Sequence, residues 1–127
     1  TSNICTNSGL GALAFTIHLS LLGEAGLRRL AEINHAHAVR LADKLAAVRG
    51  VEVLVDAFFN EFTIRVNADA QNTIEALAQR GILGGVPVSR LLPQDRDLRD
   101  LIVVASTEMN TDQDREAYAE ALAEILR

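Results

Sequence analysis

Val51-Glu52-Val53-Leu54-Val55 and Glu61-Phe62-Thr63-Ile64-Arg65-Val66 are the two stretches of this sequence that decide its fold. The first has valine at every second position, and in the second Phe62, Ile64 and Val66 alternate with polar side chains. A period of two is typical of a strand with one buried face. The short break between the stretches therefore predicts an antiparallel hairpin whose apolar face needs a cover.

A short helix and a turn-rich loop follow the hairpin. The segment 70–80 predicts a helix that ends at Gly81, with Ile74, Leu77 and Ala78 facing inward. Residues 81–87 form a loop with room for a short strand. Its Gly84-Gly85 pair lacks the strand-turn-helix spacing of a phosphate-binding fingerprint, so a turn that needs positive φ is the favoured reading.

The end of the chain completes the sheet and its cover. The solidly apolar run 101–105 predicts a strand in the middle of the sheet. Thr111, with Asp114 three residues later, resembles a capping box, so a last helix is expected from there to about Leu126.

Two helices are expected before the hairpin. The first, about residues 7–22, is apolar nearly all round, which predicts that it is buried or packed against another domain. Gly23 ends or bends it. The second, about 24–48, carries an apolar stripe from Leu27 through Leu30 and Ala31 to Val48 and is stopped by Gly50; it resembles a connector.

The predicted order is therefore helix, helix, strand, strand, helix, short strand, strand, helix. This is an α+β fold, with helices on one face of a small, mostly antiparallel sheet. We expect residues 1–127 to form a single domain, with buried and connector helices over 1–48 and an α/β sandwich over 49–127.

Composition narrows the class of protein. A chain of 127 residues suits one domain or a closed piece of a larger protein. The formal net charge of -5, with acids and bases interleaved, argues against nucleic acid or an anionic membrane surface as partner. One cysteine fits a reducing compartment. The apolar run from Leu10 to Leu22 is short for a membrane span and follows no basic segment, so we expect a soluble, intracellular protein.

The first seven residues form an uncharged polar stretch ahead of the first helix. Cys5 there would be a nucleophile, a redox switch or a packing residue; packing is favoured because no basic side chain is near in sequence. Asn3, Thr6 and Asn7 would bind an anion at the helix start or cap the helix, and capping is favoured.

Four ionisable side chains on the predicted helices are candidate chemical groups. His35 and His37 are two residues apart, so they point to different faces of a helix and cannot share one metal ion. His18 fits a hydrogen-bonded core histidine. Lys44, the only lysine, lies on a face expected to be solvated and does not look like a Schiff-base lysine, which needs a desolvated pocket.

Glu108 follows the central strand. Its carboxylate would point into a cleft, or Thr107-Glu108 would simply mark a strand end that leads to a helix cap. The local sequence leaves both readings open.

Several stretches together resemble one family. They are Thr1-Ser2-Asn3-Ile4-Cys5-Thr6-Asn7, Leu19-Ser20-Leu21-Leu22-Gly23, Gly26-Leu27, Phe59-Asn60-Glu61-Phe62, Gly81-Ile82-Leu83-Gly84-Gly85-Val86-Pro87, and Thr107-Glu108 with Thr111. In this order they resemble glycine dehydrogenase (decarboxylating), the P-protein of the glycine cleavage system. The similarity is to the carboxy-terminal part of subunit 1 (alpha) of the two-subunit form.

The resemblance implies a fold and an activity. The fold is the small C-terminal domain of a fold-type I pyridoxal-phosphate-dependent transferase. The activity is that of an oxidoreductase of glycine catabolism, which decarboxylates glycine on pyridoxal phosphate and passes the aminomethyl group to the lipoyl arm of the H-protein.

The resemblance also implies partners and site residues. Pyridoxal phosphate is held by a lysine of subunit 2 (beta) in a cytoplasmic heterotetramer, so an isolated fragment is expected to be inert. Ser2, Asn3 and Thr6 are the expected cleft-lining residues toward the cofactor, with Cys5 behind them. No catalytic residue and no metal ligand are expected in this chain. Without the resemblance, a non-catalytic small-molecule regulatory module or a dimerisation module stays open.

Overall fold

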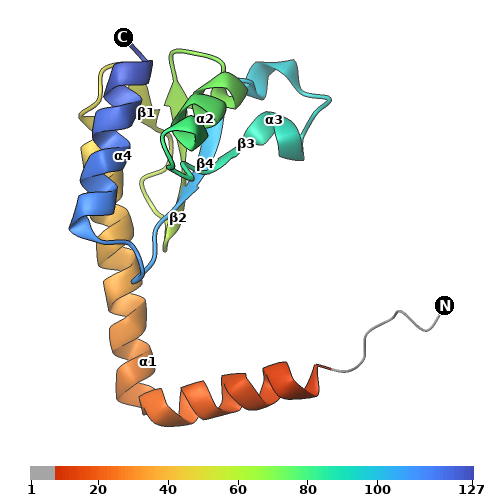
Figure 1. The fold of residues 1–127 in the computed structure, drawn as a ribbon, viewed down its shortest axis with the longest axis vertical. Coiled ribbons are helices and arrows are strands. Elements are labelled where there is room, and N and C mark those ends of the chain that lie inside the picture. Colours follow the sequence, from red (N-terminus) through yellow and green to blue (C-terminus); the bar gives the residue numbers. More distant parts are fainter. Residues whose placement is uncertain (1–7) are drawn as a thin grey trace, which may run out of the picture. The chain divides into compact units, whose positions relative to one another are not determined.

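The computed structural model describes residues 8–127 of the chain (Figure 1). In chain order the elements are α1 (Gly9–Ala46), β1 (Val51–Val53), β2 (Glu61–Val66), α2 (Ala70–Gln79), β3 (Val86–Pro87), α3 (Val88–Leu91), the 3-10 helix η1 (Arg96–Leu98), β4 (Leu101–Ala105) and α4 (Asp112–Ile125). The sequence did not predict α3 and η1.

The strands form one antiparallel sheet in the order β1-β2-β4-β3. Val53 pairs with Ile64, and Ile64 pairs with Ile102 on the other side, so the hairpin and the inner position of β4 are confirmed. The two residues of β3 form the short strand expected between 81 and 87. In Figure 1, β2 and β4 lie between the two shorter strands.

The core lies on one face of this sheet. Phe62, Ile64 and Val66 are buried, while Glu61 and Arg65 on the opposite face are exposed. The buried cluster joins these strand residues to side chains of α2, α4 and the C-terminal part of α1. Helices therefore cover one face of a mostly antiparallel sheet, as the α+β prediction requires.

Helix α2 fits its predicted limits but turns a slightly different face inward. Its buried residues are Ala70, Thr73, Ile74 and Leu77, which have the i, i+3, i+4, i+7 spacing of one helix face. Ala78 is exposed, so its predicted inward orientation is wrong, because this residue lies about 100° around the helix from Leu77.

Contacts divide the chain into two compact units, Thr1–Glu32 and Ile33–Arg127, and the division falls inside α1. In the second unit α1 buries Ala38, Leu41, Ala42 and Leu45, and Gly50 after it has φ 87. The apolar stripe is therefore buried only from Ala38 onward. The expectation of a single domain over residues 1–127 stays a prediction.

In the first unit α1 is interrupted at Gly23, which has φ 61 and ψ -173 and confirms the predicted bend or end. The large apolar side chains before it are exposed; they are Leu10, Leu13, Phe15, Ile17 and Leu21. His18 is also exposed. Its assignment as a core histidine is wrong in this chain, because the helical turns around it are themselves open to solvent.

Taken together as one helix of 38 residues despite the interruption at Gly23, α1 could cross a membrane by length and composition alone. None of its most apolar window is buried in this structure. Helices near the N-terminus and the core helices of soluble proteins satisfy the same two criteria, so this observation alone assigns no membrane location.

Candidate functional site

Two loops meet at one end of the sheet. The first, residues 56–60, leads into β2, and the second, residues 106–110, leaves β4; we call them the strand-end loops. Because Glu61, the first residue of β2, pairs with Ala105, the last residue of β4, antiparallel pairing brings both loops to the same end of the sheet. The Ser106 backbone N–H donates to the Asn60 carbonyl over 3.0 Å and joins them directly.

The loop 106–110 is organised by its own polar groups. The Thr107 N–H donates to Asn110 Oδ1 at 2.8 Å, and the Met109 N–H donates to Thr107 Oγ1 at 3.2 Å. The Asn110 N–H in turn donates to the Thr107 carbonyl at 3.1 Å. Such side-chain-to-backbone bonds define a tight turn after a strand.

One turn of α1 holds both strand-end loops. Asn34 Oδ1 accepts from the Glu108 N–H at 2.8 Å, and His37 Nδ1 lies 3.0 Å from the Thr107 carbonyl. His35 Nδ1 lies 2.8 Å from the carbonyl of Phe59. A carbonyl can only accept, so Nδ1 carries the hydrogen in both histidines.

The two histidines therefore serve different loops, as their spacing of two predicts. The His35 ring also stacks on Phe59, with ring centroids 6.3 Å apart and planes inclined by 11°. Within residues 8–127 no group of three or more His, Cys, Asp or Glu side chains could hold a metal ion.

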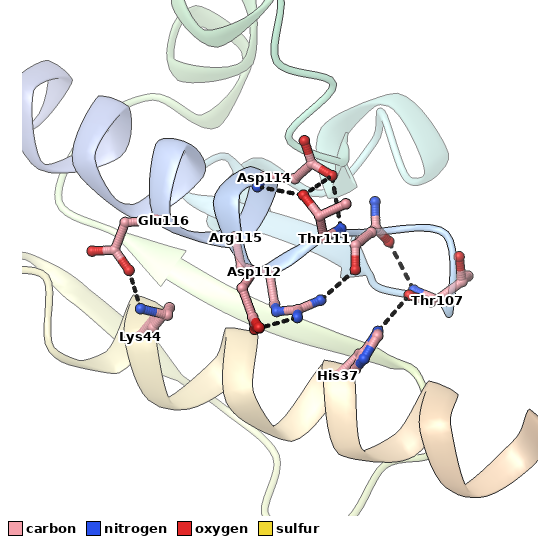
Figure 2. A network of polar contacts seen from close by, with 9 residues as sticks. His37, Lys44, Thr107, Thr111, Asp112, Asp114, Arg115 and Glu116 are labelled. Carbon is pink, nitrogen blue, oxygen red and sulfur yellow. Dashed lines mark hydrogen bonds and ion pairs between the residues drawn. The ribbon is translucent and has the colours of Figure 1, made fainter. Parts of the chain in front are cut away.

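The N-terminus of α4 borders the second loop and carries the predicted capping box (Figure 2). Thr111 Oγ1 accepts from the Asp114 N–H at 3.1 Å, while Asp114 Oδ2 accepts from the Thr111 N–H at 2.7 Å. The Thr111 N–H and the Thr111 hydroxyl both donate to Asp114 Oδ2, and these two hydrogen bonds lower the pKa of the Asp114 carboxyl below its usual value.

Arg115 ties α4 to the strand-end loop, and sequence reasoning missed it. Its side chain is 2% exposed; Nη1 donates to the Asn110 carbonyl and Nη2 to Asp112 Oδ1, both at 2.6 Å. Figure 2 shows this guanidinium between α4 and α1. The same hydrogen bond and charge lower the pKa of the Asp112 carboxyl. The i, i+3 spacing of Asp112 and Arg115 was the available signal.

A cavity of about 450 Å³ lies beside Arg115, between α4 and the loop 81–85. Leu83 and Tyr118 line it from these two elements. The buried Tyr118 hydroxyl donates to the Gly84 carbonyl at 2.5 Å, and burial raises the pKa of this phenol well above its usual value. Gly85 has φ 128, which confirms the predicted turn with positive φ.

The structure places the remaining candidates as follows. Lys44 forms an ion pair with Glu116 across α1 and α4, visible in Figure 2. The Glu108 side chain is exposed at the end of the sheet. The predicted cleft-lining residues Ser2, Asn3 and Thr6, together with Cys5 and the capping candidate Asn7, lie outside the described residues.

Known proteins match this chain along almost its whole length. The family model described as glycine cleavage system P-protein matches residues 1–122. Probable glycine dehydrogenase (decarboxylating) subunit 1 of Azorhizobium caulinodans is 68% identical over 126 residues, which cover 99% of this chain and 28% of that protein. The corresponding subunit 1 of Beijerinckia indica is 67% identical over 123 residues, 97% of this chain and 27% of that protein.

Solved structures also match the fold of this chain. A crystal structure of glycine decarboxylase (P-protein) of the glycine cleavage system, in inhibitor-bound form, matches with a TM-score of 0.84 and 37% identity over 98% of this chain and 28% of that chain. An aminotransferase, TlmJ from Streptoalloteichus hindustanus, matches with a TM-score of 0.60 at 16% identity over 81% of this chain and 34% of that chain, which shows the fold alone.

These matches confirm the implied fold, which is that of the small domain of fold-type I pyridoxal-phosphate-dependent enzymes. The chain spans about 28% of the length of the curated relatives it matches. The match of the family model over residues 1–122 shows that this chain belongs to the glycine cleavage system P-protein family.

Proposed function

We propose that this chain is part of subunit 1 (alpha) of a two-subunit glycine dehydrogenase (decarboxylating), an oxidoreductase of glycine catabolism. The observation that carries the proposal is the 68% identity over 99% of the chain to a probable subunit 1. In the proposed reaction glycine loses its carboxylate, and the aminomethyl group passes to the lipoyl group of the H-protein.

Pyridoxal phosphate is the implied cofactor, and it would supply an electron sink for the carbanion left by decarboxylation. The described residues do not fit the attachment site of this cofactor. Lys44 is the only lysine of the chain, and its ammonium is paired with the Glu116 carboxylate on a half-exposed surface. A lysine that holds pyridoxal phosphate needs a desolvated pocket and no such competing carboxylate.

As the resemblance to the two-subunit form implies, the proposal assigns the cofactor lysine to subunit 2 (beta) and a supporting role to this chain. Ser2, Asn3 and Thr6 stay the proposed cleft-lining residues, supported by their small, polar, uncharged side chains ahead of a helix. We further propose that the subunits form a heterotetramer of two alpha and two beta subunits. We also propose that this assembly is cytoplasmic, because a chain with a single cysteine has no internal disulfide and fits a reducing compartment.

The test uses three samples with pyridoxal phosphate and the H-protein: the 127-residue chain, the full-length subunit 1, and subunit 1 with subunit 2. We expect release of carbon dioxide from labelled glycine only with both full-length subunits, because the cofactor lysine enters with subunit 2. Release by the 127-residue chain alone would contradict the assignment of the lysine to the partner.

The second candidate is a small-molecule regulatory module, favoured by the cavity of about 450 Å³ between α4 and the loop 81–85. A thermal-shift series with free amino acids separates the two candidates. A rise in the melting temperature of the isolated 127-residue chain that saturates with one amino acid would support the regulatory module.

A further inference from the structure

Helix α1 bends at a residue whose backbone conformation favours glycine. Gly23 has φ 61 and ψ -173, while the residues on both sides of it are helical. An L-residue is strained at these angles unless its surroundings hold it there. Among residues 8–127, apart from the adjoining residues and the helix backbone itself, nothing lies within 4 Å of a Cβ added at Gly23. Glycine therefore serves the backbone conformation at this position and not close packing.

A second glycine makes room for the bend. In a regular helix the Cβ atoms of residues four apart are about 5–6 Å from each other. A Cβ added at Gly26 would lie only 3.1 Å from the Cβ of Leu22, because the bend at Gly23 comes between these two residues and brings them together. Leu22 and Gly26 are both half-buried in a part of α1 that is largely exposed. The contact of Leu22 with Gly26 therefore belongs to the bent state.

Side-chain polar contacts hold each part of α1 by itself. Before the bend, the Thr16 and Ser20 hydroxyls donate to carbonyls one turn back in the helix. After the bend, two arginines pair with glutamates of the same part, Arg28 with Glu24 and Arg29 with Glu32. These contacts persist when the angle between the two parts changes. Because glycine also adopts the helical region, a straight helix is open to this chain as well.

We propose that Gly23 and Gly26 form a hinge in α1. At this hinge the apolar stretch 9–22 turns between the bent arrangement described here and a straight continuation of the helix. The two states differ in the backbone of Gly23 and in the contact between Leu22 and Gly26. All these residues belong to the first compact unit, Thr1–Glu32, so the two states can be measured without the rest of the subunit.

The test measures the distance between spin labels on either side of the hinge by pulsed electron paramagnetic resonance. Leu10→Cys and Glu32→Cys carry the labels, because both side chains are exposed, and Cys5, the only cysteine of the chain, is replaced by serine. A straight helix separates the two labelled backbones by about 33 Å. The wild-type hinge should give a main distance well below this value and a minor distance near it. Dilution with unlabelled chain removes distances between copies.

Substitutions at Gly23 should move the two populations in opposite directions. Gly23→Ala should raise the ratio of straight to bent chains at least about tenfold, because L-alanine is strained at φ 61 and favours the helix. D-alanine in place of Gly23, introduced by semisynthesis, should leave the short distance alone. For a D-residue, φ 61 and ψ -173 mirror the extended region that L-residues adopt readily.

Two further variants test the hinge independently. Gly26→Ala should also shift the population toward the long distance, since its Cβ meets that of Leu22 only in the bent state. Gly11→Ala is the matched control, because Gly11 lies between the labels and is not among the glycines with positive φ. This variant should leave both distances unchanged. The unfolding midpoint of the sheet should stay the same in all variants, because the second compact unit has its own core.

A single distance in the wild-type chain would overturn the hinge. The short distance alone would show a fixed corner, and the long distance alone a straight helix. Equal distance distributions in the chains with L-alanine and D-alanine at position 23 would contradict the role of Gly23. These measurements do not use decarboxylation, so their result leaves the proposed function unaffected.

Discussion

Gly85 shows how one residue fixes the edge of the sheet. Its φ of 128 is in the range that favours glycine, and an added Cβ would lie 2.3 Å from the Val103 carbonyl oxygen. We therefore expect Gly85→Ala to lower the free energy of unfolding by about 3 kcal/mol, from backbone strain and the lost approach of β3 to β4. Urea unfolding followed by circular dichroism measures this change.

Gly11→Ala is the matched control for that substitution. Gly11 lies inside α1, and nothing lies within 4 Å of an added Cβ. The unfolding transition of the sheet should not change in this variant. Equal stability of Gly85→Ala and wild type would show that the loop relaxes without the positive φ.

At the scale of elements, the N-terminus of α4 gives this chain a defined acid sensitivity. The folded pKa values of Asp112 and Asp114 lie below their ordinary value of 3.8, so these carboxylates stabilise the folded state above that pH. The contribution is lost as the pH falls through the folded pKa values. Asp114→Asn should therefore be less stable than wild type at neutral pH, and the difference should shrink below pH 3.8.

Thr111 provides the control, because it supplies the hydrogen bonds that lower the pKa of Asp114. Thr111→Ala should lower the free energy of unfolding by about 1 kcal/mol. The double variant Thr111→Ala with Asp114→Asn should lower it by less than the sum of the two single substitutions. Urea midpoints at neutral pH and in acid measure both effects. If the effects of the two substitutions simply add, Thr111 and Asp114 stabilise the helix start independently, which contradicts this prediction.

The elements that the sequence predicts well are those with local causes. The alternation in β1 and β2 and the Thr111–Asp114 cap each depend on residues a few positions apart, and both are found in the structure. The single turns α3 and η1 are too short to show a period and were not predicted.

Burial and the candidate site depend on tertiary contacts, which a local pattern does not contain. The apolar neighbours of His18 predict that its side chain is buried, yet burial needs a covering element, and His18 is exposed. The contacts of one turn of α1 with Phe59 and Thr107 join positions 24 and 70 residues apart, so no spacing rule reveals them. The predicted residues Ser2, Asn3 and Thr6 stay predictions.

At the scale of the whole molecule, the two contact units predict a step in local stability along α1. Residues of the first unit expose their apolar side chains, whereas Ala38, Leu41 and Leu45 belong to the buried part of the second. Backbone amides from 10 to 30 should therefore exchange hydrogen on the order of a thousandfold faster than those from 41 to 46. Hydrogen–deuterium exchange of the 127-residue chain measures this difference peptide by peptide.

The same measurement on the full-length subunit tests why the first stretch of α1 is so apolar. Thr16 and Ser20 donate their hydroxyl hydrogens to the carbonyls of Ala12 and Thr16 in their own helix, so covering this stretch would leave neither donor unpaired. If it packs against another domain, amides 10–30 should gain protection in the full-length protein, while the β4 amides, the internal control, stay as slow as before. Fast exchange of this stretch in both proteins would contradict such packing, because a covered helix opens only with the structure around it.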